Sequence, residues 1–161
     1  MANNTREAGA AFRRAYADPN ISAGAKAIGE TNYAFMAINN REAAIALRHA
    51  RTARDHLAGS KSPLWNLDAY IDVAEGVAAW AAGDTDRAER RLSDAAQKMP
   101  RDEAPLVYLV QLYTSLNQTE AASAARSRLE QSTSFSGEIP AMAFTLFWID
   151  PKTGAIERRS R

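Results

Sequence analysis

Residues 76–100 read GVAAWAAGDTDRAERRLSDAAQKMP, the segment with the strongest structural signal in the chain. Gly83-Asp84 marks a boundary between two helices, because glycine accepts the left-handed conformation that closes a helix and aspartate caps the next one. Gly76 and Ala88 are small, which lets two antiparallel helices approach closely. The final proline ends the second helix. The stretch therefore predicts a tight helical hairpin.

Strong helix formers continue on both sides of this hairpin, as far as about Gln131. Breakers such as Asn39-Asn40 and Asn117 divide them into helices of ordinary length. Short links make successive helices antiparallel neighbours, so the predicted fold class is all-α, a stack of αα-hairpins. We expect helices at about residues 5–17, 22–38, 41–57, 64–82, 87–98, 104–116 and 120–131.

The hairpin pattern recurs along the chain. Asn117 and Ala122 repeat the positions of Gly83 and Ala88 after about 34 residues, the period of the tetratricopeptide repeat, which the chain resembles. Residues 69–102 and 103–136 look like two consecutive repeats, and residues 22–57 like a looser copy. The resemblance implies a right-handed superhelix over residues 1–137.

The first helices of such repeats line a concave groove that binds a peptide or helix of a partner protein. The resemblance therefore implies a groove with aromatic and aliphatic anchors, which suit protein recognition. The alternative is that some of these side chains pack internally. Carried over by position, the groove residues are Tyr70, Val73, Val77, Trp80, Val107, Tyr108, Gln111 and Thr114.

Acidic residues depart from the family pattern in the helix before Gly83. Asp68, Asp72 and Glu75 share one helical face, at positions that the family usually makes apolar. One hypothesis is a metal or acid–base site. A second is an ion-paired face against Arg48, Arg51 or Arg54 of the preceding helix, and a third is a shifted repeat register.

Basic residues gather on the helix predicted at 41–57. Arg41, Arg48, Arg51 and Arg54 could hold a phosphate or an acidic peptide, or could simply form a solvated face. His49 and His56 are two turns apart, which is too far for the usual pair of metal ligands four residues apart. We interpret both histidines as surface or packing residues.

The C-terminal segment, residues 138–161, changes in character. Phe144–Ile149 is aromatic and β-branched, and Asp150–Gly154 has the composition of a turn. This favours a β-hairpin, with a capping helix over residues 138–149 as the alternative. The aromatic side chains of Phe144, Phe147 and Trp148 need cover. They could cap the last helices or pair with a second copy in a homodimer.

Composition narrows the function classes. The net charge of +1 gives no field that favours nucleic acid or an acidic membrane, and the absence of cysteine excludes thiolate sites. No apolar run approaches a membrane span and no secretory leader is visible, so we expect a cytoplasmic protein, of bacterial type by its arginine and alanine usage. Catalytic motifs are absent. We expect a non-enzymatic interaction module without cofactor or metal, an adaptor or a chaperone-like protein, with a self-assembling structural subunit as the alternative.

Overall fold

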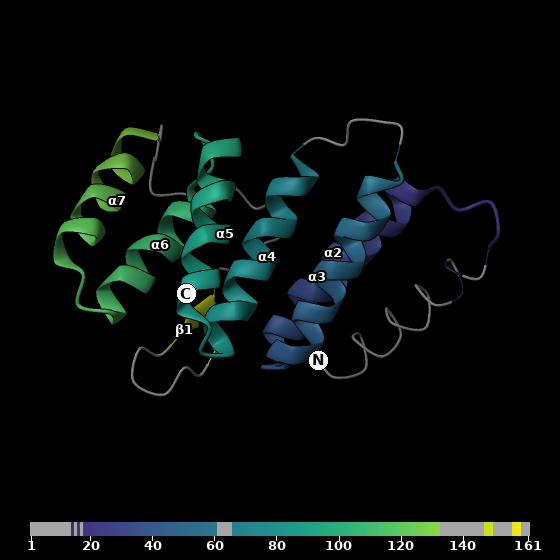
Figure 1. The fold of residues 1–161 in the computed structure, drawn as a ribbon, viewed down its shortest axis with the longest axis horizontal. Coiled ribbons are helices and arrows are strands. Elements are labelled where there is room, and N and C mark those ends of the chain that lie inside the picture. The colour runs from purple at the N-terminus through teal and green to yellow at the C-terminus, as the bar shows by residue number, and fades with distance from the viewer. Residues whose placement is uncertain are drawn as a thin grey trace.

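The computed structural model describes residues 14, 16, 18–60, 66–132, 147–149 and 156–158. Between residues 18 and 132, the described chain is a row of antiparallel helices that runs along the long axis of the molecule (Figure 1). The predicted all-α hairpin stack is confirmed. Its helices are α2 (Ala23–Asn39), α3 (Ala43–Ala58), α4 (Leu67–Ala81), α5 (Thr85–Lys98), α6 (Glu103–Ser115) and α7 (Thr119–Ser132). The helix predicted at residues 5–17 falls almost entirely outside the described residues.

Side-chain caps fix where α2 and α5 begin. The Oγ of Ser22 accepts from the backbone N–H of Ala25 at 3.2 Å at the start of α2. Asp84 caps α5 in the predicted way, with Oδ1 accepting from the N–H of Arg87 at 3.2 Å. Each cap satisfies an N–H that the helix itself cannot use.

The turns that close α2, α4 and α6 share one geometry. A left-handed residue follows each helix: Arg41 (φ 64°), Gly83 (φ 83°) and Asn117 (φ 58°). The next N–H bonds back five residues, as in the bond from Asp84 N–H to the carbonyl oxygen of Ala79 at 2.9 Å, the mark of a Schellman motif. Gly83 and Asn117 act as predicted. At the predicted Asn39-Asn40 turn, the left-handed residue is Arg41, because α2 extends to Asn39.

The hairpins form two rows of helices. Helix α2 packs on α4, and α4 packs on α6, whereas α3, α5 and α7 meet one another at most marginally within the described residues. Helices that approach each other lie on the inside of a curved stack. We therefore call the side of α2, α4 and α6 the inner face, and the side of α3, α5 and α7 the outer face.

Close packing of α4 against α5 depends on small residues. A side chain at Gly76 would place its Cβ 2.8 Å from Cγ of Leu92 and 3.3 Å from the carbonyl oxygen of Ala88. Ala88 and Leu92 are themselves fully buried. The glycine is therefore required by the approach of two helices, as the sequence predicted.

Two short strands are described after the helices. Strand β1 (Phe147–Ile149) pairs antiparallel with β2 (Ile156–Arg158), with Trp148 opposite Glu157. This agrees with the β-hairpin interpretation rather than with a helix ending at Ile149. Strand β2 contacts α2, and in Figure 1 β1 lies beside the lower part of α5, between the two ends of the row.

Candidate functional site

The outer side of α4 carries two buried carboxylates. Asp72 and Glu75 lie on α4 where the repeat family usually has apolar side chains, and their side chains are 0% and 2% exposed. Burying a carboxylate is costly unless cations and hydrogen bonds compensate it. The surrounding helices supply both.

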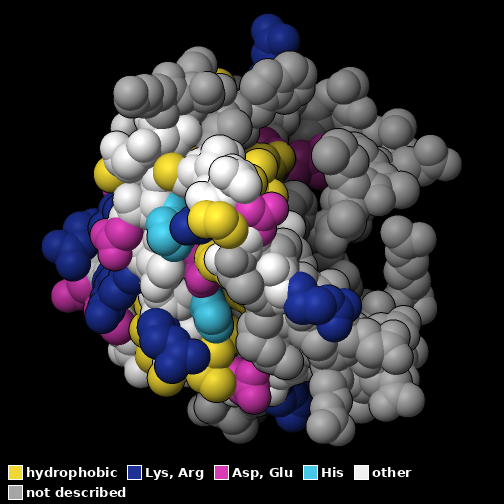
Figure 2. Space-filling model, turned by 90° about the vertical axis from the view of Figure 1, so that its right-hand side faces the viewer, with side chains coloured by type: hydrophobic (Ala, Val, Ile, Leu, Met, Phe, Trp, Pro, Cys, Tyr) yellow, Lys and Arg dark blue, Asp and Glu magenta, His cyan; other side chains and the backbone are white. Residues whose placement is uncertain are grey.

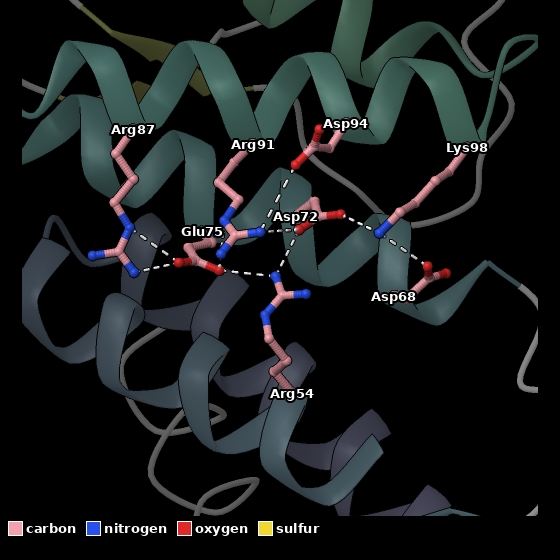
Figure 3. A network of polar contacts seen from close by, with 8 residues as sticks. All are labelled: Arg54, Asp68, Asp72, Glu75, Arg87, Arg91, Asp94 and Lys98. Carbon is pink, nitrogen blue, oxygen red and sulfur yellow. Dashed lines mark hydrogen bonds and ion pairs between the residues drawn. The ribbon is translucent and has the colours of Figure 1, made fainter. Parts of the chain in front are cut away.

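Cations from two helices converge on these carboxylates (Figure 3). From α3, Arg54 donates from Nη2 to Asp72 Oδ1 at 2.6 Å and to Glu75 Oε2 at 2.8 Å. From α5, Arg87 donates from Nε to Glu75 Oε1 at 3.0 Å and also from Nη2. Lys98 Nζ donates to Asp72 Oδ2 at 2.6 Å.

A further arginine and the flanking acids complete this outer ion network. Arg91 lies between the carboxylates, with Nη1 at 3.4 Å from Asp72 Oδ1 and Nε at 3.3 Å from Glu75 Oε2. Lys98 also pairs with Asp68 at 3.0 Å, and Arg91 lies 3.8 Å from Asp94. The network thus joins α3, α4 and α5, and so links two neighbouring hairpins.

The environment of Glu75 acts on its pKa in two opposing ways. Burial, the largest single influence, raises it, but hydrogen bonds from Arg87 and Arg54 and the charge of Arg91 outweigh burial. The net result is a lowered pKa. A carboxylate held ionised in this way is a poor proton donor or acceptor at neutral pH.

The ion-pairing hypothesis is therefore confirmed for Asp72 and Glu75, with Arg54 as the partner from the preceding helix. For Asp68 it is wrong about the partner, which is Lys98 of the following helix. Each carboxylate oxygen of Asp72 and Glu75 lies within ion-pairing distance of an arginine or lysine nitrogen. Within the described residues, no group of three or more His, Cys, Asp or Glu side chains is arranged to hold a metal ion. The outer ion network is best understood as a structural link.

The sequence interpretation missed the partners on α5. Arg87, Arg91 and Lys98 run in the opposite order to the carboxylates that they contact, since Arg87 meets Glu75 and Lys98 meets Asp68. Antiparallel helices joined at Gly83 require this reversed order. Matching opposite charges across the predicted turn would have found the pairs.

The predicted basic face is divided. Arg54 belongs to the outer ion network, and Arg41 lies in the turn after α2 rather than on α3. Arg48 and Arg51 lie on α3 and are exposed. Figure 2, which looks onto the α2–α3 end of the row, shows basic and acidic side chains interspersed on the described surface. The arrangement favours a solvated face over a single anion site.

Both histidines pack against the side chains of neighbouring helices. His49 Nδ1 lies 2.5 Å from Glu30 Oε2 of α2, and its ring stacks on Tyr33 with centroids 5.1 Å apart. His56 approaches the ring of Tyr16 at 6.3 Å. These contacts fit the packing interpretation of the histidines.

The predicted groove residues on α4 are largely enclosed. Val73, Val77 and Trp80 are buried, at 2%, 0% and 6% exposure. Tyr70 is half-buried and donates from its hydroxyl to Asp102 Oδ2 at 3.1 Å, and burial together with the nearby Asp102 raises its pKa to about 12. Helix α4 thus contributes more to the core than an open groove would require.

Helix α6 keeps more of its predicted groove surface accessible. Tyr108 is buried, Val107 and Gln111 are partly buried, and Thr114 is exposed. The side-chain Oε1 of Gln111 is buried and accepts no hydrogen bond from any described residue. A buried acceptor of this kind is uncommon and suits an N–H donor supplied by a ligand.

The predicted tail residues can be placed only in part. Phe147 and Trp148 lie in β1, next to one another along the strand. Phe144 lies outside the described residues.

The fold was compared with known proteins by sequence and by structure. Residues 79–133, from the end of α4 to the end of α7, match a family model described as tetratricopeptide repeat. This match supports assigning the chain to that family. Tetratricopeptide repeats generally mediate protein–protein interactions. No curated protein and no solved structure matches the chain.

The match covers the segment in which the sequence analysis placed the clearest repeats. It begins within α4, so the repeat character of α2 and α3 rests on their hairpin packing against α4. Among the described helices, none is long and apolar enough to cross a membrane.

Proposed function

We propose that the chain binds a segment of a partner protein along its inner face, as a non-catalytic adaptor or chaperone-like module. The observation that carries the proposal is the difference between the two faces. On the outer face, ion pairs within the chain link the helices. On α6, three partly or fully accessible residues follow one another at groove positions: Val107, Gln111 and Thr114.

The chemistry of this row suits a peptide backbone. Val107 and Thr114 flank Gln111 at helical spacing, so one side chain can provide apolar contact while the next accepts a hydrogen bond. The Oε1 of Gln111 is already desolvated, so it could accept a hydrogen bond from an N–H of the bound segment without a further desolvation cost for this oxygen. An extended or helical segment with apolar side chains fits this pattern.

Affinity capture from the native host with matched variants tests the proposal. Val107→Glu with Thr114→Glu changes the inner face, and Ala44→Glu with Gln97→Glu makes the same charge change at exposed outer positions. We expect a partner that the wild type and the outer variant both recover, and that the inner variant recovers at least ten-fold less.

The opposite pattern, with recovery lost only in the outer variant, would overturn the proposal. Light scattering on the same samples tests the competing hypothesis of self-assembly. A folded wild type with twice the mass of one chain, and no captured protein except itself, would favour a structural subunit.

A further inference from the structure

Helix α4 is buried around its whole circumference. Asp72 and Ala74 are two residues apart and so project from roughly opposite sides of the helix, yet both are fully buried. Val77, on the same inner side as Ala74, is also fully buried. A helix that is covered only on one side shows a single buried stripe. The inner side of α4 therefore needs a cover of its own.

The helices account for the other sides of α4. On the outer side, α3 and α5 enclose it through the ion network, and α2 and α6 adjoin it along the inner row. The remaining described element is the β1–β2 hairpin. Cα atoms of β2 lie within 8 Å of Cα atoms of α2, which belongs to the inner row.

The hairpin itself requires such a support. An isolated two-stranded hairpin is marginally stable at best, and both of its edges carry unpaired backbone groups. The chain can reach the inner row: residues 133–146, fully extended, span up to about 45 Å. At usual helix spacing, α6 and α2 are only about 20 Å apart. Figure 1 places β1 beside the lower part of α5, not beyond α7.

We propose that the β1–β2 hairpin is an intramolecular occupant of the inner face along α2 and α4, which a protein partner must displace. The proposal rests on the proposed function for its consequence, because displacement matters only if a partner binds there. While the hairpin occupies this face, a partner can bind only those molecules in which the hairpin is released. The apparent affinity of the partner is therefore the intrinsic affinity multiplied by that fraction of molecules.

A peptide supplied in trans tests the occupancy. The probe is a fluorescein-labelled synthetic peptide with the sequence of residues 144–158, FTLFWIDPKTGAIER. The variant Ile156→Pro with Glu157→Pro weakens the hairpin, since alternate residues direct their N–H toward the paired strand and one of two adjacent prolines removes such a donor. Ser160→Pro with Arg161→Pro, beyond β2, is the matched control.

Fluorescence polarisation should give a Kd for the peptide at least ten-fold lower with the Ile156→Pro/Glu157→Pro chain than with the wild type or the control. Equal affinity for all three chains would overturn the proposal. Circular dichroism confirms that each variant keeps its helices.

A distance measurement tests the docking of the hairpin without the proline variant, and so also applies if that variant does not fold. The chain has no cysteine, so Asn32→Cys in α2 and Glu157→Cys in β2 introduce one pair for spin labels. Double electron–electron resonance should show one narrow distribution of short distances between the two spin labels in the otherwise unchanged chain. A broad distribution of long distances would contradict a docked hairpin.

The two proposals can fail separately. A docked hairpin with no captured partner would mean that the inner face holds only the chain's own tail, and the proposed function would be wrong. Equal capture of a partner by the wild type and the hairpin variant would leave the proposed function standing and refute the need for displacement.

Discussion

The two sides of α4 are built by different means. On the outer side, Asp72 and Glu75 are buried among cations from α3 and α5, and every link lies within the chain. On the inner side, Ala74 and Val77 are apolar and fully buried, and α6 of the same row carries partly or fully accessible residues. Ion pairs with fixed partners fix how the hairpins pack, whereas an apolar face can exchange one cover for another. The contrast separates a structural side from the side on which we propose that a partner binds.

The largest expected effect comes from the close approach beneath the outer ion network. Ala88→Trp should destabilise the chain by about 3 kcal/mol or more, because Ala88 is fully buried and its carbonyl would lie 3.3 Å from a Cβ at Gly76. The corresponding fall in Tm is on the order of 10 °C. Thermal unfolding followed by circular dichroism measures it.

Ala44→Trp, at an exposed position of α3, is the matched control and should change Tm little. Near-normal stability of the Ala88 variant would show that α4 and α5 do not depend on this contact.

The next effect concerns a buried acid. Glu75→Ala should destabilise by about 2–3 kcal/mol, since it leaves Arg87 and Arg54 without their shared carboxylate. The value is lower than for a fully enclosed pair, because the arginines are partly exposed and water can solvate them. Urea unfolding gives the free energy, with Glu130→Ala on the exposed side of α7 as control. Equal stability of the two variants would refute a structural role of the outer ion network.

The contribution of Glu75 to stability should decrease at acidic pH. The pKa of Glu75 is lowered in the folded chain, so its contribution is complete above the unfolded value of about 4.3 and is lost as the pH falls through the lowered folded value. The stability gap between wild type and Glu75→Gln should therefore be constant near pH 7 and narrow below about pH 4. Unfolding measured across this range checks it, and a gap that does not change with pH would argue against an ionised Glu75.

The smallest effect is expected on the inner face of α6. Thr114→Ala should change stability by no more than about 0.5 kcal/mol, because the side chain is exposed and its hydroxyl donates to the carbonyl oxygen of Val110 within its own helix, at 2.7 Å. The same denaturant titration tests it. A loss as large as that of Glu75→Ala would mean that both faces are structural, and the comparison between them would fail.

Much of the helical framework could be predicted from local signals. Gly83-Asp84 and Asn117 act where the sequence placed them, because left-handed turns and caps depend on the residue itself. The left-handed Arg41 could not be read in this way, since the hydrogen bonds that close α2 hold it. The hairpin strands were favoured by composition, but their contact with α2 depends on the path of the chain.

The candidate site was harder to predict than the framework. Arg54 was found because it lies one helix before the acids, whereas Arg87, Arg91 and Lys98 are on the following helix and depend on how α5 rotates over α4. The burial of Trp80 and Tyr108 was not distinguishable from groove exposure by sequence, because an aromatic residue at a groove position suits either. In the structure both belong to the hydrophobic core that the helices form together.

Site-specific photo-crosslinking in the native host tests the central claim most directly. Benzoylphenylalanine replaces either Thr114 on the inner face or Gln97 on the outer face, both exposed. If a partner binds on the inner face, we expect a crosslinked adduct with a partner protein from position 114 and none from position 97. Adducts from position 97 alone would contradict it.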